Sequence, residues 1–137
     1  MAQPTQVAYP SGTAIAFRTG IGLHDISLLA SGNGFSAASI TAHAGGTRTP
    51  ATLITSAQTL IAVCATAGDS VMLPPAVGGQ VLWIANGGAA SAQLFAAVGT
   101  SDTINGIAAA TGFALPNAHS ITLFSPIQGA WFGVLSA

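Results

Sequence analysis

Residues 71–137 are a succession of short apolar segments, and turn residues separate each segment from the next. Glycine, asparagine and proline mark the breaks, for example at Gly78-Gly79, Asn86-Gly87 and Asn105-Gly106. Asn and Gly accept the positive φ angles that tight hairpins require. Short strands at this spacing are typical of a β-sandwich, a jelly roll or a barrel. We therefore predict an all-β fold, an antiparallel β-sandwich or jelly roll with strands at 59–65, 70–73, 80–85, 92–96, 113–115, 120–125 and 130–135.

The first 50 residues are less regular, and we divide them into two parts. Residues 1–12 are polar or small, contain two prolines and show no periodic pattern, so we expect an extended arm. Residues 13–50 are expected to form an N-terminal β region, with an alternating segment at 35–43 and a glycine-rich break at its end. Residues 51–137 would form the main β-sandwich. All of these parts are expected to belong to one compact domain.

The chain is unusually poor in charge. Charged residues make up 4% of the sequence, against about 25% in an average soluble protein. There is no lysine or glutamate, and the charged residues are Arg18, Arg48, Asp25, Asp69 and Asp102. Either neutral polar side chains cover the surface or other subunits do. We expect other subunits, because apolar area left in water costs about 25 cal/mol per Å² relative to burial.

High apolarity could also indicate a membrane protein, but the pattern does not support one. A spanning helix needs about 20 mainly apolar residues, and polar residues interrupt the best candidate, 53–67. The first residues lack the basic start of a secretory signal. Cys64 is the only cysteine, so no intrachain disulfide is possible, and its apolar neighbours predict a small buried side chain.

Few residues could support catalysis or ligand binding. The candidates are Asp25, Asp69, Asp102, His24, His43 and His119. No G-x-S-x-G elbow accompanies them, and the aspartates fit turns or caps better than a glycosidase pair. The histidines lack metal-ligand spacing, although three copies of one could meet at a trimer axis.

Nucleotide and nucleic-acid binding are not expected either. The G-x-G-x-x-A match at 32–37 has no acidic residue about 20 positions on. The absence of lysine excludes a P-loop, and two arginines cannot build a basic patch. We therefore predict no enzyme activity, no catalytic, cofactor or metal site, and neither nucleic acid nor membrane as a partner.

The second half resembles a small β-sandwich module of tailed-bacteriophage virion proteins. That module has a V-x-L-P segment, a glycine, a strand ending in Asn, a D-T-I-N-G turn, a strand ending in Ser, and a final G-x-W. The matching residues here are Val71-Met72-Leu73-Pro74, Gly79, Val81 to Asn86, Asp102 to Gly106, Ile121 to Ser125 and Gly129-Ala130-Trp131. The match covers about half the chain, and residues 1–50 have no counterpart in it. In this module we expect Asp102 and Asn105 to bond nearby backbone NH groups, Gly106 to take positive φ, and Trp131 to anchor the last strand in the core.

The resemblance implies a structural protein of the virion, since such modules occur in capsid decoration (cement) proteins and in tail-fibre or baseplate parts, usually as trimers. We expect a decoration protein on the capsid surface, with itself, as a homotrimer, and the major capsid protein as partners. The alternative is a tail-fibre, spike or baseplate module that binds a host-surface glycan. Its aromatic candidates would be Tyr9, Trp83 and Trp131, although the tryptophans fit the core better.

Overall fold

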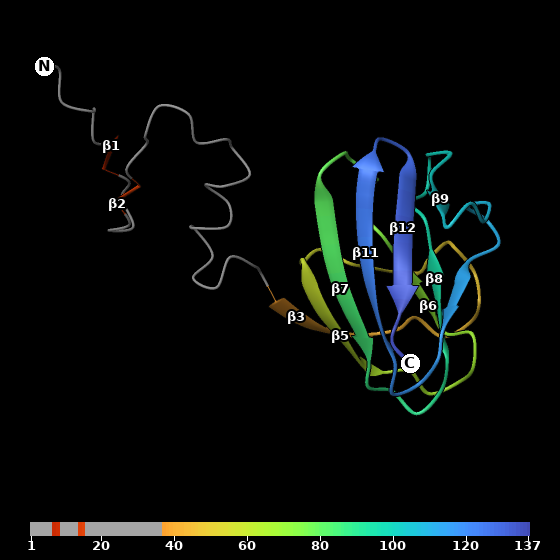
Figure 1. Cartoon of the computed structure of the whole chain (residues 1–137). Coiled ribbons are helices and arrows are strands. Elements are labelled where there is room, and N and C mark those ends of the chain that lie inside the picture. The colour runs from red at the N-terminus through yellow and green to blue at the C-terminus, as the bar shows by residue number, and fades with distance from the viewer. Residues whose placement is uncertain (1–6, 9–13, 16–36) are drawn as a thin grey trace, which may run out of the picture. The chain divides into compact units, whose positions relative to one another are not determined.

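The computed structural model describes residues 7–8, 14–15 and 37–137. The chain divides into two units, Met1–Ser36 and Ala37–Ala137. In the first unit, β1 (Val7–Ala8) pairs antiparallel with β2 (Ala14–Ile15) (Figure 1). The expected arm and the sequence up to residue 36 otherwise lie outside the described residues. So do the candidates Tyr9, Arg18, His24 and Asp25.

The second unit is built from β-strands alone. No helix occurs between residues 37 and 137. The strands are β3 (Ala37–Thr41), β4 (Thr52–Leu53), β5 (Gln58–Val63), β6 (Ser70–Met72), β7 (Gln80–Asn86), β8 (Ala92–Phe95), β9 (Thr103–Ile104), β10 (Phe113–Leu115), β11 (Ser120–Ile127) and β12 (Ala130–Leu135). Each strand predicted after residue 50 overlaps one of these. The all-β prediction is therefore confirmed for the described residues.

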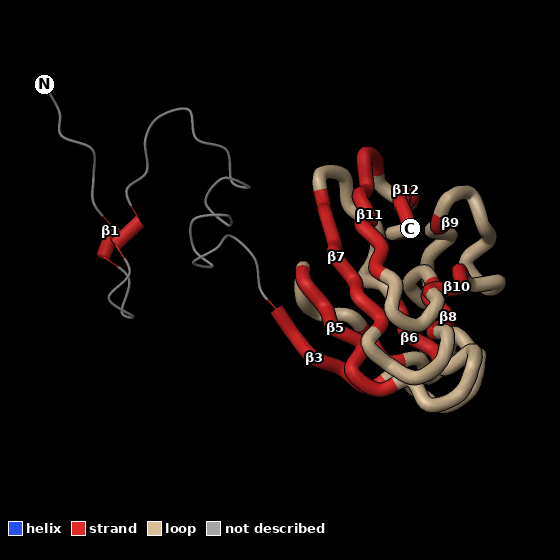
Figure 2. Tube along the Cα trace, turned by 60° about the horizontal axis from the view of Figure 1, so that its bottom comes forward, coloured by secondary structure: helices blue, strands red, loops and turns tan. Residues whose placement is uncertain are grey.

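The strands form two sheets, and the chain passes from one to the other at each step between β3 and β8. A six-stranded sheet has the order β3-β5-β7-β11-β12-β9, and a four-stranded sheet has the order β10-β8-β6-β4. Within the first, β3, β5 and β7 are parallel neighbours; within the second, β4, β6 and β8 are. This part of the chain is a β-solenoid, in which each turn adds one strand to each sheet (Figure 2).

The C-terminal part adds three antiparallel pairs and one parallel pair, that of β12 with β9. The β11–β12 hairpin pairs with β7 through β11, and β10 pairs with β8. The expected antiparallel jelly roll is thus wrong for β3 to β8. The turn residues were located correctly, but at Gly78-Gly79 and at Asn86-Gly87 the chain turns from one sheet to the other instead of forming hairpins. Gly79 has φ +90°, so glycine is needed at that corner.

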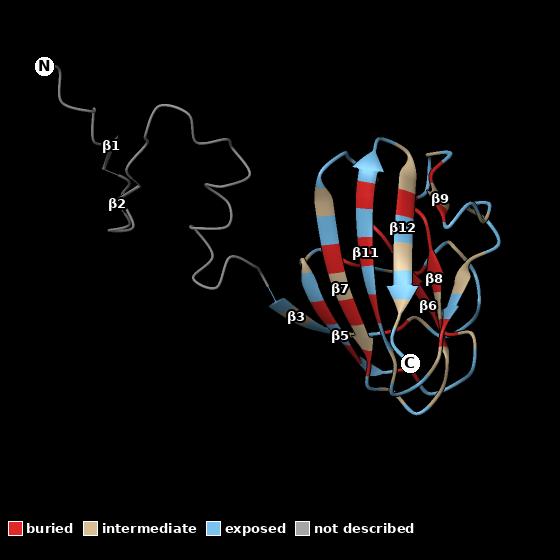
Figure 3. Cartoon of the chain, in the orientation of Figure 1, coloured by how far each residue is buried: buried red, intermediate tan, exposed pale blue. Residues whose placement is uncertain are grey.

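The core lies between the two sheets. In β11, Ile121 and Leu123 are buried while Thr122 and Phe124 are exposed, as the two-residue period of a strand requires (Figure 3). Leu94 faces the same core from the four-stranded sheet. β3 joins this unit by pairing with β5. The expected division at residue 50 therefore falls inside the second unit.

Candidate interaction surface

Three of the motif pieces of the C-terminal half meet in one hydrogen-bonded cluster, which we call the clasp (Pro74–Ala76, Asp102–Asn105, Gly129–Gly133). The Asp102 carboxylate accepts a bond from the Ala76 NH at 2.7 Å. The Gly129 NH donates to the Ala76 carbonyl and the Thr103 NH to the Gly129 carbonyl, both at 3.1 Å. The indole NH of Trp131 donates to the Pro74 carbonyl at 3.3 Å. The loop after β6 is thus tied to β9 and β12, which belong to the other sheet.

The D-T-I-N-G segment behaves largely as expected. Asn105 accepts from the Gly133 NH at 2.8 Å and donates to the Gly133 carbonyl at 3.2 Å. Asn105 and Gly106 have φ +50° and +77°, which confirms the turn. Asp102 and Asn105 bond to backbone NH groups, as expected, but these groups are not nearby in the sequence. Their partners lie 26 and 28 residues away in the chain, because the fold brings distant loops together.

Trp131 is fully buried, as predicted, and forms part of the core. Asp102, Gly129 and Trp131 of the sequence pattern therefore connect the two sheets through hydrogen bonds to the loop after β6. The clasp thus serves as a structural element.

Among the described residues, exposed apolar side chains gather most on the solvent side of the six-stranded sheet, which we call the outer face. Register places its residues in rows across neighbouring strands. One row joins Val81, Phe124 and Phe132. The other two rows comprise Gln58, Trp83, Thr122 and Val134, and Ser39, Leu60, Ala85 and Ser120.

The apolar side chains of the outer face are substantially exposed. Phe124 is 44% exposed and Phe132 42%, and their rings stack with centroids 6.0 Å apart. Val134 is 70% exposed. Exposed residues occur on each of the neighbouring strands β5, β7, β11 and β12 (Figure 3). The outer face carries no ionisable side chain, because its polar members are serine, threonine and glutamine.

The solvent side of the four-stranded sheet differs, because the chain itself covers part of it. Phe95 alternates with the core residue Leu94 and so points away from the core, yet it is only 2% exposed. Gly112 lies against it, since a Cβ atom there would come within 2.9 Å of the Phe95 ring. The Gln93 amide donates to the Thr111 carbonyl on the same side. Phe95 on the four-stranded sheet is thus covered, whereas Phe124 and Phe132 on the six-stranded sheet are exposed to water.

The charged side chains that the structure describes form hydrogen bonds with backbone groups. Arg48 donates to the Ala96, Ala97 and Thr100 carbonyls and so closes the loop after β8. The Asp69 carboxylate accepts from the NH groups of Gly45, Ala65 and Thr66. The bond from Thr66 is the main cause that holds the pKa of Asp69 below its usual value, against the opposing effect of burial.

Two of the remaining chemistry-bearing residues, Cys64 and His43, lie close enough to Asp69 to interact with its charge. Cys64 is buried as predicted, and burial together with the Asp69 charge raises the pKa of its thiol. His119 is bonded through Nδ1 to the Asn117 carbonyl. The Nδ1 atom of His43 is buried without a hydrogen-bond partner. No group of three metal-ligating side chains occurs in the part of the chain that the structure describes.

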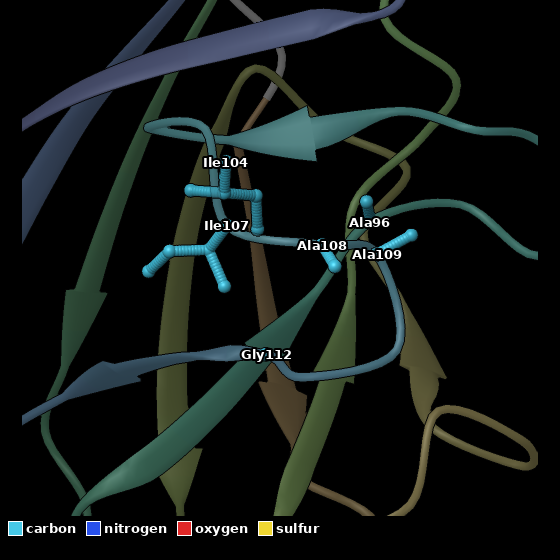
Figure 4. A pocket seen from close by; sticks show the side chains of 6 residues that line it. All are labelled: Ala96, Ile104, Ile107, Ala108, Ala109 and Gly112. Carbon is cyan, nitrogen blue, oxygen red and sulfur yellow. The ribbon is translucent and has the colours of Figure 1, made fainter.

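A shallow apolar depression lies beside β9, lined by Ala96, Ile104, Ile107, Ala108, Ala109 and Gly112 (Figure 4). It leaves no space that a water molecule could occupy. Its lining presents only apolar side chains, so it offers nothing to orient a polar substrate.

Comparison with protein families, with curated proteins and with solved structures gave no match. Within residues 37–137 and the two short strands before them, the chain contains no helix able to span a bilayer. The exposed apolar side chains of the outer face are of the kind that mark interaction sites. Sequence reasoning did not identify the outer face, although the alternation in 121–125 already placed Phe124 opposite the core residues Ile121 and Leu123.

Proposed function

We propose that this chain is a structural virion protein, a capsid decoration (cement) protein that binds the outer shell of a tailed phage as a homotrimer and stabilises it. The observation that carries the proposal is the outer face, where apolar side chains meet water and no charge is present. Patches of this kind mark interaction sites. The phage virion is proposed as the location because the clasp residues resemble a virion module.

The mechanism is stabilisation by selective binding. A protein that binds the assembled shell and not its free subunits shifts the equilibrium toward the shell by mass action. Burial of neutral, apolar surface at two kinds of interface, within the trimer and against the shell, supplies the free energy, at about 25 cal/mol per Å². The described charged groups Arg48, Asp69 and Asp102 direct their hydrogen bonds to the backbone of their own chain.

Of the two aromatic candidates for glycan binding that the structure describes, Trp83 is the one that supports this alternative. Trp131 fills the core and cannot stack on a sugar, whereas Trp83 is half-buried on the outer face. Labelling of the chain at the tail tip in electron micrographs, or binding on a glycan array that a Trp83→Ala variant loses, would favour this alternative.

The decoration function is tested in the phage that encodes the chain. Purified virions should contain it in a fixed ratio to the major capsid protein, and virions lacking the gene should release DNA at a lower temperature. Adding the purified protein back should restore the original temperature. A chain that is missing from virions, or shells that are equally robust without it, would contradict the proposal.

A further inference from the structure

We infer that the outer face is the contact between copies of this chain, so that in the trimer of the proposed function three outer faces surround a common axis. The inference rests on the proposed function only in assuming that three copies associate. The identity of the surface and of its occupant comes from three properties of the outer face: its charge, its hydrogen-bonding groups and its extent.

The charge of the outer face favours a copy of the same chain as occupant. An average protein surface brings many charged residues, and burying an unpaired charge against apolar groups is costly. The outer face has no ionisable side chain that could pair with such a charge. A second copy of the same face brings none, so neither side loses the hydration of an ion.

The polar groups of the outer face can pair with their own copies. Ser39, Ser120 and Thr122 carry hydroxyls, and Gln58 carries an amide. Each of these groups both donates and accepts hydrogen bonds. Around a symmetry axis the same residues of several copies meet, and groups of this kind can bond to one another there. Carboxylates or ammonium groups, which only accept or only donate, would repel.

The extent of the outer face suits a specific contact. Strands lie about 4.8 Å apart and rise about 3.3 Å per residue, so four neighbouring strands of about six residues cover roughly 400 Å² in projection. This falls within the range of about 300–600 Å² that the largest apolar patch on a typical monomer covers, and such a patch is often functional. The stacked rings of Phe124 and Phe132 lie on adjacent strands within it and supply large, rigid contact area.

The experiment measures the native mass of wild type and of matched variants. The variant Phe124→Ser/Phe132→Ser removes the stacked rings, and Leu53→Ser/Val98→Ser removes two side chains of similar exposure, 45% and 49%, outside the outer face. We expect the mass of the first variant to fall to that of one chain and the mass of the second to stay at three chains. A first variant that remains trimeric, or a monomeric wild type, would overturn the inference.

A second pair of variants keeps the test decisive if the phenylalanine variant does not fold. Val134→Arg places a charge on the most exposed residue of the outer face, and Val98→Arg places one in a loop. Val134 contributes little to the core, so the variant should fold and lose the trimer, while Val98→Arg should retain it. A trimeric Val134→Arg would contradict the inference.

Shell binding of the same proteins separates this inference from the proposed function. If wild type is a trimer that the outer-face variants dissociate, yet it does not bind shells of its phage, the inference stands and the function fails. If all variants remain trimeric and still bind shells, the function stands and the inference fails.

Discussion

Asp102 and Ala76 are 26 residues apart, yet the carboxylate of the first accepts a 2.7 Å hydrogen bond from the backbone NH of the second. Asp102 immediately precedes β9 in the six-stranded sheet, and Ala76 follows β6 of the four-stranded sheet. Both residues are buried. This bond is therefore a direct link between the two layers of the fold at one end of the sheets.

Removing the carboxylate should destabilise the protein. Asp102→Ala leaves the Ala76 NH buried without a partner, and we expect a loss of about 1–3 kcal/mol in the free energy of unfolding. Asp102→Asn keeps an oxygen at the same place and should lose less. Urea denaturation of both variants at fixed protein concentration checks this, and equal stability of Asp102→Ala and wild type would show that the link is dispensable.

Asn86 should be a second position of high sensitivity. Its buried amide donates to the Ala90 and Leu115 carbonyls and accepts from the Gly88 NH. Asn86→Ala removes these three bonds and leaves the Leu115 carbonyl with the long bond from the Ser91 hydroxyl, and we expect a loss of at least about 2 kcal/mol. Gln128→Ala, which removes an exposed amide, should change the free energy of unfolding by less than about 0.5 kcal/mol. Thermal and chemical unfolding of the pair would decide, and similar values for both would contradict the role of Asn86.

Gly133 should not tolerate a larger residue. A Cβ atom there would come within 2.7 Å of Leu123 Cδ2 and 2.8 Å of Ile121 Cδ1. We expect Gly133→Ala to cost about 1–3 kcal/mol through overpacking. Adding Leu123→Val makes room, so the double variant should be more stable than the sum of the two single effects predicts. Strict additivity in this double-mutant cycle would rule out the steric explanation.

The stability should depend on pH through Asp69. Its pKa is lowered in the folded chain, chiefly by the bond from the Thr66 NH. A lowered folded pKa stabilises the fold above the ordinary value of 3.8, and this contribution is lost as the pH falls through the lower folded pKa. We expect the wild-type free energy of unfolding to decline as the pH falls below 3.8. Asp69→Asn should be less stable at neutral pH and show a flatter dependence in the same range, so parallel profiles would contradict the assignment.

The sequence predicts the elements better than their pairing. Turn residues such as Gly79 and Gly106 have local causes, since positive φ favours glycine, and so they could be located in advance. Burial of Trp131 and Cys64 follows from apolar character. Whether a strand pairs with its neighbour in sequence or with the one after next depends on long-range packing. This is why the parallel pairing among β3 to β8 was not predicted.

The site was harder to predict than the fold. Low charge indicated that apolar surface would need a partner, but it did not say which surface. Phe124 and Phe132 belong to the same row only because β11 and β12 form a hairpin with Phe124 opposite Phe132. Asp102 was expected to bond locally, and its actual partner, Ala76, depends on the meeting of two loops from different sheets.

The most direct test of the account is the native mass of the purified wild-type protein across a range of concentrations. In the proposed trimer, copies of the same chain cover the apolar, uncharged surface. We therefore expect a species of three times the 13.4 kDa chain mass that persists on dilution to the micromolar range. A stable, soluble species of 13.4 kDa at every concentration would contradict the account.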